Sequence, residues 1–184
     1  LTTADAGYCW GEGDRGMLGD GTQNWTVTPV PVAGGLAFHK ISPGLLHTCG
    51  VTTGAAAYCW GYNQSGELGD GTTMLGGWRL TPGAVGGGLV FSSLQGGTAF
   101  TCGLTISGQA YCWGYNLYGQ LGDGTTTDRS TPTLVTGGLV FQSIGVGSHH
   151  ACGQTFPGAI YCWGSNSYGQ LGDGTTTERH QPVP

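Results

Sequence analysis

Cysteines at a fixed spacing are the residues of this 184-residue chain with the clearest chemistry. Between two such cysteines lies a short hairpin pattern, with a turn at a position such as Ser107-Gly108. This turn would place the cysteines opposite each other on adjacent strands, where facing Cβ atoms are about 4.5–5.5 Å apart and a disulfide can form. Six of the seven cysteines make three pairs, each ten residues apart: Cys49 and Cys59, Cys102 and Cys112, Cys152 and Cys162.

Three disulfides are our preferred interpretation of these pairs, and they would indicate an oxidising compartment. Reduced structural thiols are the alternative. Zinc is the least favoured interpretation, because zinc-binding cysteines usually lie about two to four residues apart. The histidines also follow the cysteines at no fixed offset.

Cys9 is the odd cysteine. The segment from Leu1 to Trp10 aligns with the segment from Val51 to Trp60, and in that register a Cys-Gly pair would stand immediately before Leu1. We therefore expect Cys9 to be unpaired and the chain to begin inside a repeat of a longer array. A reactive free thiol is the alternative.

The acidic and histidine side chains form no catalytic pattern. Four Leu-Gly-Asp-Gly-Thr segments each offer one aspartate, whereas Ca²⁺ takes about six to eight oxygen ligands, so we expect the Asp and Thr side chains to hydrogen-bond the turn backbone. His149 stands at nearly the same repeat position as His47, which favours a structural role. No acid follows at a fixed spacing to form a triad or a metal site. The sequence therefore predicts no catalytic residue, no metal, no cofactor and no enzymatic activity.

The elements that carry these residues belong to a repeat. Its tryptophans are Trp10, Trp60, Trp113 and Trp163, at steps of 50, 53 and 50 residues. In one period we predict strands at 139–144, 151–155 and 159–163, and we place 126–132 in a polar segment whose proline marks a loop or an edge. Short strands with frequent turns predict an all-β fold of β-propeller blades.

Composition excludes several classes of function. Charged residues make up 8% of the chain, the formal net charge is −5, and the arginines form no basic run, which argues against nucleic-acid binding. No stretch approaches eighteen consecutive apolar residues, so we predict no membrane span. We expect a single repeat array over residues 1–184, with units at approximately 1–9 (partial), 10–59, 60–112, 113–162 and 163–184 (partial).

The repeated residues are Trp-Gly-x-Asn-x-x-Gly-Gln-Leu-Gly-Asp-Gly-Thr, then Pro, Gly-Gly-Leu-x-Phe, Ile-x-x-Gly, His-Thr/Ala-Cys-Gly and Gly-x-x-Tyr-Cys-Trp, and they recur over essentially the whole chain. This pattern resembles the regulator of chromosome condensation repeat. Residues 12–17 and the insertion at 74–79 depart from the pattern. The resemblance implies a seven-bladed propeller of ~50-residue repeats. About three and a half repeats are present in this sequence. Two such chains could together approximate a ring, but our preferred interpretation is that the sequence is part of one longer chain.

Residues that differ between the copies are the better candidates for function, since the scaffold does not require them. Aromatic and arginine side chains on loops are typical interface anchors. The candidates for binding are Trp25, Trp78, Arg79, Tyr118, His149, His150 and Tyr168. Asn24-Trp25-Thr26 and Asn63-Gln64-Ser65 also match the glycosylation sequon.

The leading hypothesis is a non-catalytic, extracellular or cell-surface propeller module that binds a protein, or a glycan, through its loops. The cysteine-paired repeats look like those of secreted or surface bacterial proteins. The family resemblance also implies regulators, among them exchange factors for small GTPases and a secreted inhibitor of β-lactamases, so a secreted inhibitor or regulator of a partner enzyme is one alternative. A structural subunit of a surface fibre or sheath is another, in which open blade edges associate.

Overall fold

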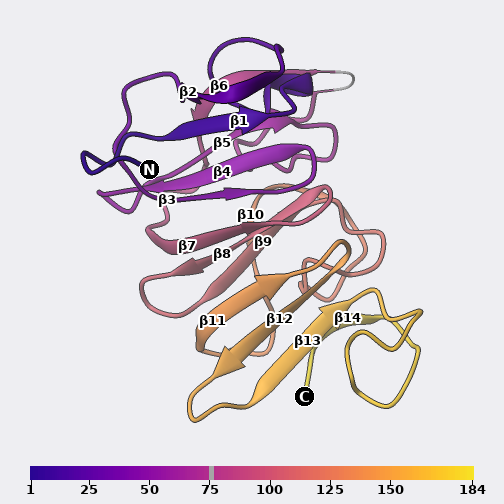
Figure 1. Ribbon diagram of the computed structural model, residues 1–184. Helices are drawn as coiled ribbons and strands as arrows, with labels where there is room; N and C mark the ends of the chain where they lie inside the picture. Colours follow the sequence, from indigo (N-terminus) through magenta and orange to yellow (C-terminus); the bar gives the residue numbers. More distant parts are fainter. Residues whose placement is uncertain (75–76) are drawn as a thin grey trace.

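The computed structural model describes residues 1–74 and 77–184, and it arranges them as antiparallel sheets stacked in chain order (Figure 1). The predicted all-β blade fold is confirmed. The first sheet is a half-blade of β1 (Tyr8–Gly11) and β2 (Thr26–Pro31). The three full blades are β3 (Phe38–Pro43), β4 (His47–Thr52), β5 (Ala57–Tyr62) and β6 (Trp78–Ala84); β7 (Phe91–Gly96), β8 (Phe100–Thr105), β9 (Ala110–Gly114) and β10 (Arg129–Leu134); and β11 (Phe141–Val146), β12 (His150–Thr155), β13 (Ile160–Gly164) and β14 (Arg179–Val183).

The fourth strand of each full blade is the element that the sequence pattern did not predict as a strand. The predicted polar segment 126–132 overlaps β10, which lies at one edge of its sheet and contains Pro132. Proline has no backbone N–H to donate, so an edge strand tolerates it where a central strand would not. Pro82 in β6 and Pro182 in β14 have equivalent places. The proline therefore marks a strand edge, the second of the two expected options.

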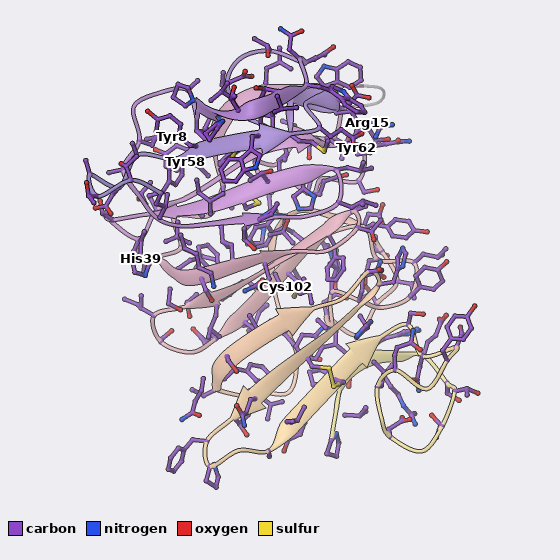
Figure 2. All side chains as sticks on the ribbon, in the orientation of Figure 1. Tyr8, Arg15, His39, Tyr58, Tyr62 and Cys102 are labelled. Carbon is purple, nitrogen blue, oxygen red and sulfur yellow. A yellow bond between two sulfur atoms is a disulfide. The ribbon has the colours of Figure 1, made fainter. Side chains whose placement is uncertain are left out.

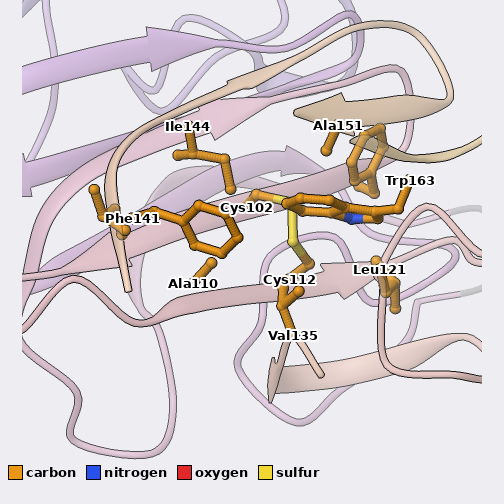
Figure 3. Packing of buried hydrophobic residues seen from close by; sticks show 11 residues of the cluster. Cys102, Ala110, Cys112, Leu121, Val135, Phe141, Ile144, Ala151 and Trp163 are labelled. Atoms are coloured by element: carbon orange, nitrogen blue, oxygen red, sulfur yellow. A yellow bond between two sulfur atoms is a disulfide. The ribbon is translucent and has the colours of Figure 1, made fainter. Parts of the chain in front are cut away.

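The hydrophobic core lies between neighbouring blades. At the junction of the second and third full blades, the Cys102–Cys112 disulfide packs among buried residues that include Phe141 and Trp163 (Figure 3). Trp163 is fully buried, and its indole Nε1 donates a hydrogen bond to the backbone oxygen of Gln120 at 3.0 Å. The equivalent bonds join Trp60 to Met17 and Trp113 to Glu67, each at 2.9 Å. Each tryptophan therefore attaches its blade to the preceding repeat.

The first glycine of three Leu-Gly-Asp-Gly-Thr segments makes room for these indoles. Gly19, Gly69 and Gly122 have φ values of 71°, 70° and 67°. A Cβ at any of them would lie 2.6–2.8 Å from the indole nitrogen of the next blade's tryptophan. Glycine is therefore required here both for its positive φ and for the close approach.

The three cysteine pairs form disulfides in the structure. Cys49 and Cys59, Cys102 and Cys112, and Cys152 and Cys162 face each other directly on the second and third strands of their blades. Cys9 on β1 is the one free cysteine among the described residues, and burial raises the pKa of its thiol.

The half-blade has the third and fourth strands of a blade. The Tyr-Cys-Trp-Gly of β1 repeats in β9 and β13, and β1 pairs with β2 as those strands pair with β10 and β14. Among the described residues, no helix has the length and apolar character needed to cross a membrane.

Candidate interaction face

Four connections between third and fourth strands gather at one end of the sheets. Their described residues are 12–25, 63–74 with 77, 115–128 and 165–178. Each begins where a third strand ends, and Gly114 at the end of β9 pairs with both Phe100 and Arg129, at the starts of β8 and β10. Figure 2 shows Arg15 and Tyr62 at this end, and Tyr8, Tyr58 and His39 at the opposite end. We call the end with the four connections the loop face.

A hydrogen-bond network builds each connection. In the third one, Asp123 Oδ1 accepts bonds from the Thr125 backbone N–H at 2.9 Å and from the Thr125 hydroxyl at 2.7 Å, and Asp123 Oδ2 pairs with Arg129 at 2.8 Å. Burial raises the pKa of Asp123, but these bonds hold it below its ordinary value. Asn116, fully buried, donates to the backbone oxygens of Thr125 and Thr127. The Asp and Asn side chains thus hold the turn.

Arg79 has the same structural position in the second connection. It pairs with Asp70, as Arg129 pairs with Asp123 and Arg179 with Asp173. Its guanidinium therefore stabilises its own loop, and nothing sets it apart as a contact for a partner. Residues 75–76 of the predicted insertion at 74–79 lie outside the described residues.

The loop face carries the whole formal charge of the chain. Nine of the ten carboxylates and all four arginines lie in the four connections or at the starts of the strands that follow, which leaves −5 on this side. Asp5 and Lys40, which lie elsewhere, cancel each other. This face therefore attracts cationic surfaces at long range.

Three aromatic side chains meet on the loop face between the second and third full blades. The ring centroids of Tyr118 and His149 are 5.2 Å apart, and Tyr115 lies 6.2 Å from Tyr118 and 6.4 Å from His149. All three pairs are edge-to-face, a favourable geometry for aromatic rings. The rings are partly exposed. We call this group the aromatic cluster.

His150, rather than His149, is the structural counterpart of His47. His47 pairs with Gly61 in the first full blade, and His150 pairs with Gly164 in the third. His149 therefore lies one residue before the His47 position, in agreement with the near equivalence inferred from the sequence. His47 is buried against Thr101, with Nε2 2.8 Å from the hydroxyl, and burial lowers its pKa to about 4. Burial, and then the charge of His149, also lowers the pKa of His150.

The remaining candidates spread along the loop face. Trp25 is 66% exposed and donates from Nε1 to Asp14 Oδ1 at 2.7 Å. Trp78 pairs across strands with Tyr62, and the Tyr62 ring has the guanidinium carbon of Arg15 5.4 Å from its centroid. Tyr168 is 94% exposed and lies outside the aromatic cluster.

The sequence interpretation missed Tyr62 and Tyr115 because they occur at the same repeat position and therefore resembled scaffold. The two sequons also differ in access. Asn24 is exposed, whereas Asn63 is fully buried and its amide donates to Thr72, so the folded chain offers no side chain for glycosylation at Asn63.

Comparisons with known proteins agree with this architecture. One model of the regulator of chromosome condensation (RCC1) repeat matches residues 107–153 and 157–184, and a second matches residues 38–67, 91–120 and 141–170. Together they cover more than half of the chain. The chain belongs to the regulator of chromosome condensation repeat family. The resemblance inferred from the repeated residues is thereby confirmed.

One RCC1-repeat relative is the ultraviolet-B receptor UVR8 of Arabidopsis thaliana, which is 36% identical over 126 residues, 66% of this chain and 28% of the receptor. The structure resembles human WBSCR16, with a TM-score of 0.88 and 21% identity over 100% of this chain and 49% of that protein. It also resembles Prp20p of Saccharomyces cerevisiae, with a TM-score of 0.83 and 23% identity over 96% of this chain and 45% of that protein. This chain therefore spans less than half the length of each of these proteins.

The two structural neighbours establish the propeller fold of the RCC1-repeat chain. Yeast Prp20 has been solved with Kap60 bound, and Prp20p has been studied for its binding to Gsp1p and histones. RCC1-like propellers thus bind protein partners.

Proposed function

We propose that this RCC1-repeat chain is a non-catalytic module that binds a protein partner through its loop face, outside the cell or at the cell surface. The observation that carries the proposal is the aromatic cluster of Tyr115, Tyr118 and His149, partly exposed on the face that has all of the net charge. Clustered aromatic side chains are typical anchors of protein interfaces.

The disulfides support the proposed location. Cys49, Cys59, Cys102 and Cys112 are fully buried between blades, so these two disulfides form part of the core. Disulfides of this kind persist in secreted and surface proteins and are rare in reducing compartments.

Affinity capture from the extracellular fraction of the source organism tests the proposal. The immobilised chain should retain a defined protein, and the double variant Tyr118→Ala/His149→Ala should lose it. Ile106→Ala is the matched control, because Ile106 is 70% exposed in the β8–β9 hairpin at the opposite end. Equal capture by all three proteins would contradict the proposal, as would capture of glycan alone, or a hydrolytic activity lost with one carboxylate.

A further inference from the structure

A tyrosine on the loop face is covered by an arginine in one repeat and left open in the next. Tyr62 and Tyr115 each follow the Trp-Gly pair of their repeats. The guanidinium carbon of Arg15 lies 5.4 Å from the ring centroid of Tyr62, within the range of a cation–π interaction. The chain thus places an arginine of its own against the tyrosine of this repeat position.

Ser65 is the counterpart of Arg15 in the repeat that precedes the repeat of Tyr115. Arg15 precedes Gly16 and Ser65 precedes Gly66, the corresponding glycines of two successive repeats. A serine side chain is too short to cover a neighbouring aromatic ring. Tyr115 has Tyr118 and His149 edge-on as neighbours, and its ring remains partly exposed. The side of Tyr115 that corresponds to the arginine-covered side of Tyr62 therefore lacks its cation.

A carboxylate stands beside this open ring. Asp128 is exposed, and its Oδ1 accepts the backbone N–H of Asn116, the residue after Tyr115, at 2.8 Å. Burial, then Tyr118 and then the charge of Asp128 raise the pKa of the Tyr115 phenol. The ion pairs among the described residues use Asp70, Asp123 and Asp173, so the Asp128 carboxylate is available to an outside cation.

We propose that Tyr115 and Asp128 form a binding site for an arginine side chain of the protein partner. The guanidinium lies over the Tyr115 ring from the Ser65 side and pairs with the Asp128 carboxylate. Arginine fits better than lysine, because a planar guanidinium can stack on a ring and donate to a carboxylate in the same pose. The net charge of −5 on the loop face draws such a side chain in.

A blocked tripeptide, acetyl-Gly-Arg-Gly-amide, tests the site directly by NMR titration of the backbone amides around Tyr115. We expect saturable shifts with a dissociation constant on the order of 1–10 mM. The matching lysine peptide should bind about threefold more weakly or worse, and the uncharged citrulline peptide should cause no saturable shift. Absence of saturation with the arginine peptide, or equal shifts with the citrulline peptide, would overturn the proposal.

Two variants locate the binding. Tyr115→Leu should weaken it at least about fivefold, and Asp128→Asn, which keeps an oxygen for the Asn116 N–H, should weaken it about two- to fivefold. Tyr8→Leu is the matched control, because Tyr8 is a 38% exposed tyrosine at the opposite end of the sheets. Thermal unfolding verifies that all three variants fold. Unchanged affinity in Tyr115→Leu, or an equal loss in Tyr8→Leu, would contradict the assignment.

The proposed arginine-binding site rests on the proposed function in one respect, because a protein partner is the source of the arginine. If the peptide binds at Tyr115 while the capture experiment finds no protein dependent on the loop face, the proposed function fails and the arginine site stands. If a protein is captured through Tyr118 and His149 but the peptide does not bind, the arginine site fails alone.

Discussion

The indole Nε1 of Trp113 donates a hydrogen bond to the backbone oxygen of Glu67 at 2.9 Å, and the Glu67 side chain is itself fully buried. Glu67 Oε2 accepts the backbone N–H of Ser65 at 2.8 Å, while Oε1 has no partner among the described residues. Gln120 and Gln170 are the counterparts of Glu67 in later repeats. An ionisable carboxyl therefore stands where the two later repeats have neutral amides.

Replacing Glu67 by Gln should stabilise the protein at neutral and alkaline pH. Burial raises the pKa of Glu67 from 4.5 to about 7, although backbone N–H groups oppose the shift. Between these values the folded chain holds a proton that the unfolded chain has lost. Stability therefore falls as pH rises from 4.5 to 7, by on the order of 3 kcal/mol.

Denaturant titrations of wild type and Glu67→Gln at about pH 5 and pH 8 measure this effect. The wild-type protein should lose stability between the two conditions, and the variant should lose much less. Parallel pH profiles for the two proteins would show that Glu67 ionises freely in the folded state.

Replacing His47 by Phe should remove a loss of folding stability at low pH. This pH dependence has the opposite sign to that of Glu67. Burial lowers the pKa of His47 from 6.5 to about 4, so between these values the unfolded chain holds a proton that the folded chain lacks. Stability is therefore present above 6.5 and is lost as pH falls to about 4, by on the order of 3 kcal/mol. Phe100 occupies the equivalent position in the next blade, so a phenyl ring fits this site. Urea titrations from about pH 4 to pH 7 measure the difference, and a variant that retains the wild-type slope would contradict it.

Removing a blade disulfide should destabilise the protein. The double variant Cys102→Ala/Cys112→Ala deletes a buried staple packed among Phe141 and Trp163, and a loss of about 2–4 kcal/mol is expected. Equilibrium denaturation under non-reducing conditions gives the value. Cys9→Ala is the control, because Cys9 has no disulfide partner among the described residues. If Cys9→Ala lost as much folding stability as the double variant, the loss could not be attributed to the disulfide.

Gly122→Ala should cost more stability than Gly138→Ala, although both glycines have a positive φ. Their φ values are 67° and 63°, so the backbone strain of an alanine is similar. A Cβ at Gly122 lies 2.8 Å from Trp163 Nε1, whereas one at Gly138 meets no described atom within 4 Å. The steric clash adds about 1–3 kcal/mol at Gly122 only. Thermal unfolding of the two variants tests this. Equal losses of stability would mean that the Trp163 side chain moves away from the new Cβ without a free-energy penalty.

Much of the fold could be predicted because the spacing of residues within the repeat indicates where its strands and turns lie. Cysteines ten residues apart around a turn imply facing strands, and the structure joins them. The spacing of the repeated tryptophans indicated the blades, and in the structure Trp60, Trp113 and Trp163 are fully buried. The fourth strand was harder to predict, because β10 is polar and contains a proline, and only its pairing with β9 makes it a strand.

The sequence by itself determined the all-β repeat, the cysteine pairing and the family, because local turns and facing positions follow from spacing along the chain. Only the tertiary structure decided which residues share a site. His149 and Tyr118 come from different blades, as do Arg15 and Tyr62, and each pair meets because successive blades stack. The contrast between Arg15 and Ser65 likewise has meaning only after stacking brings a neighbouring tyrosine beside each repeat. Contacts between blades depend on how sheets pack, and no periodicity in one repeat specifies them.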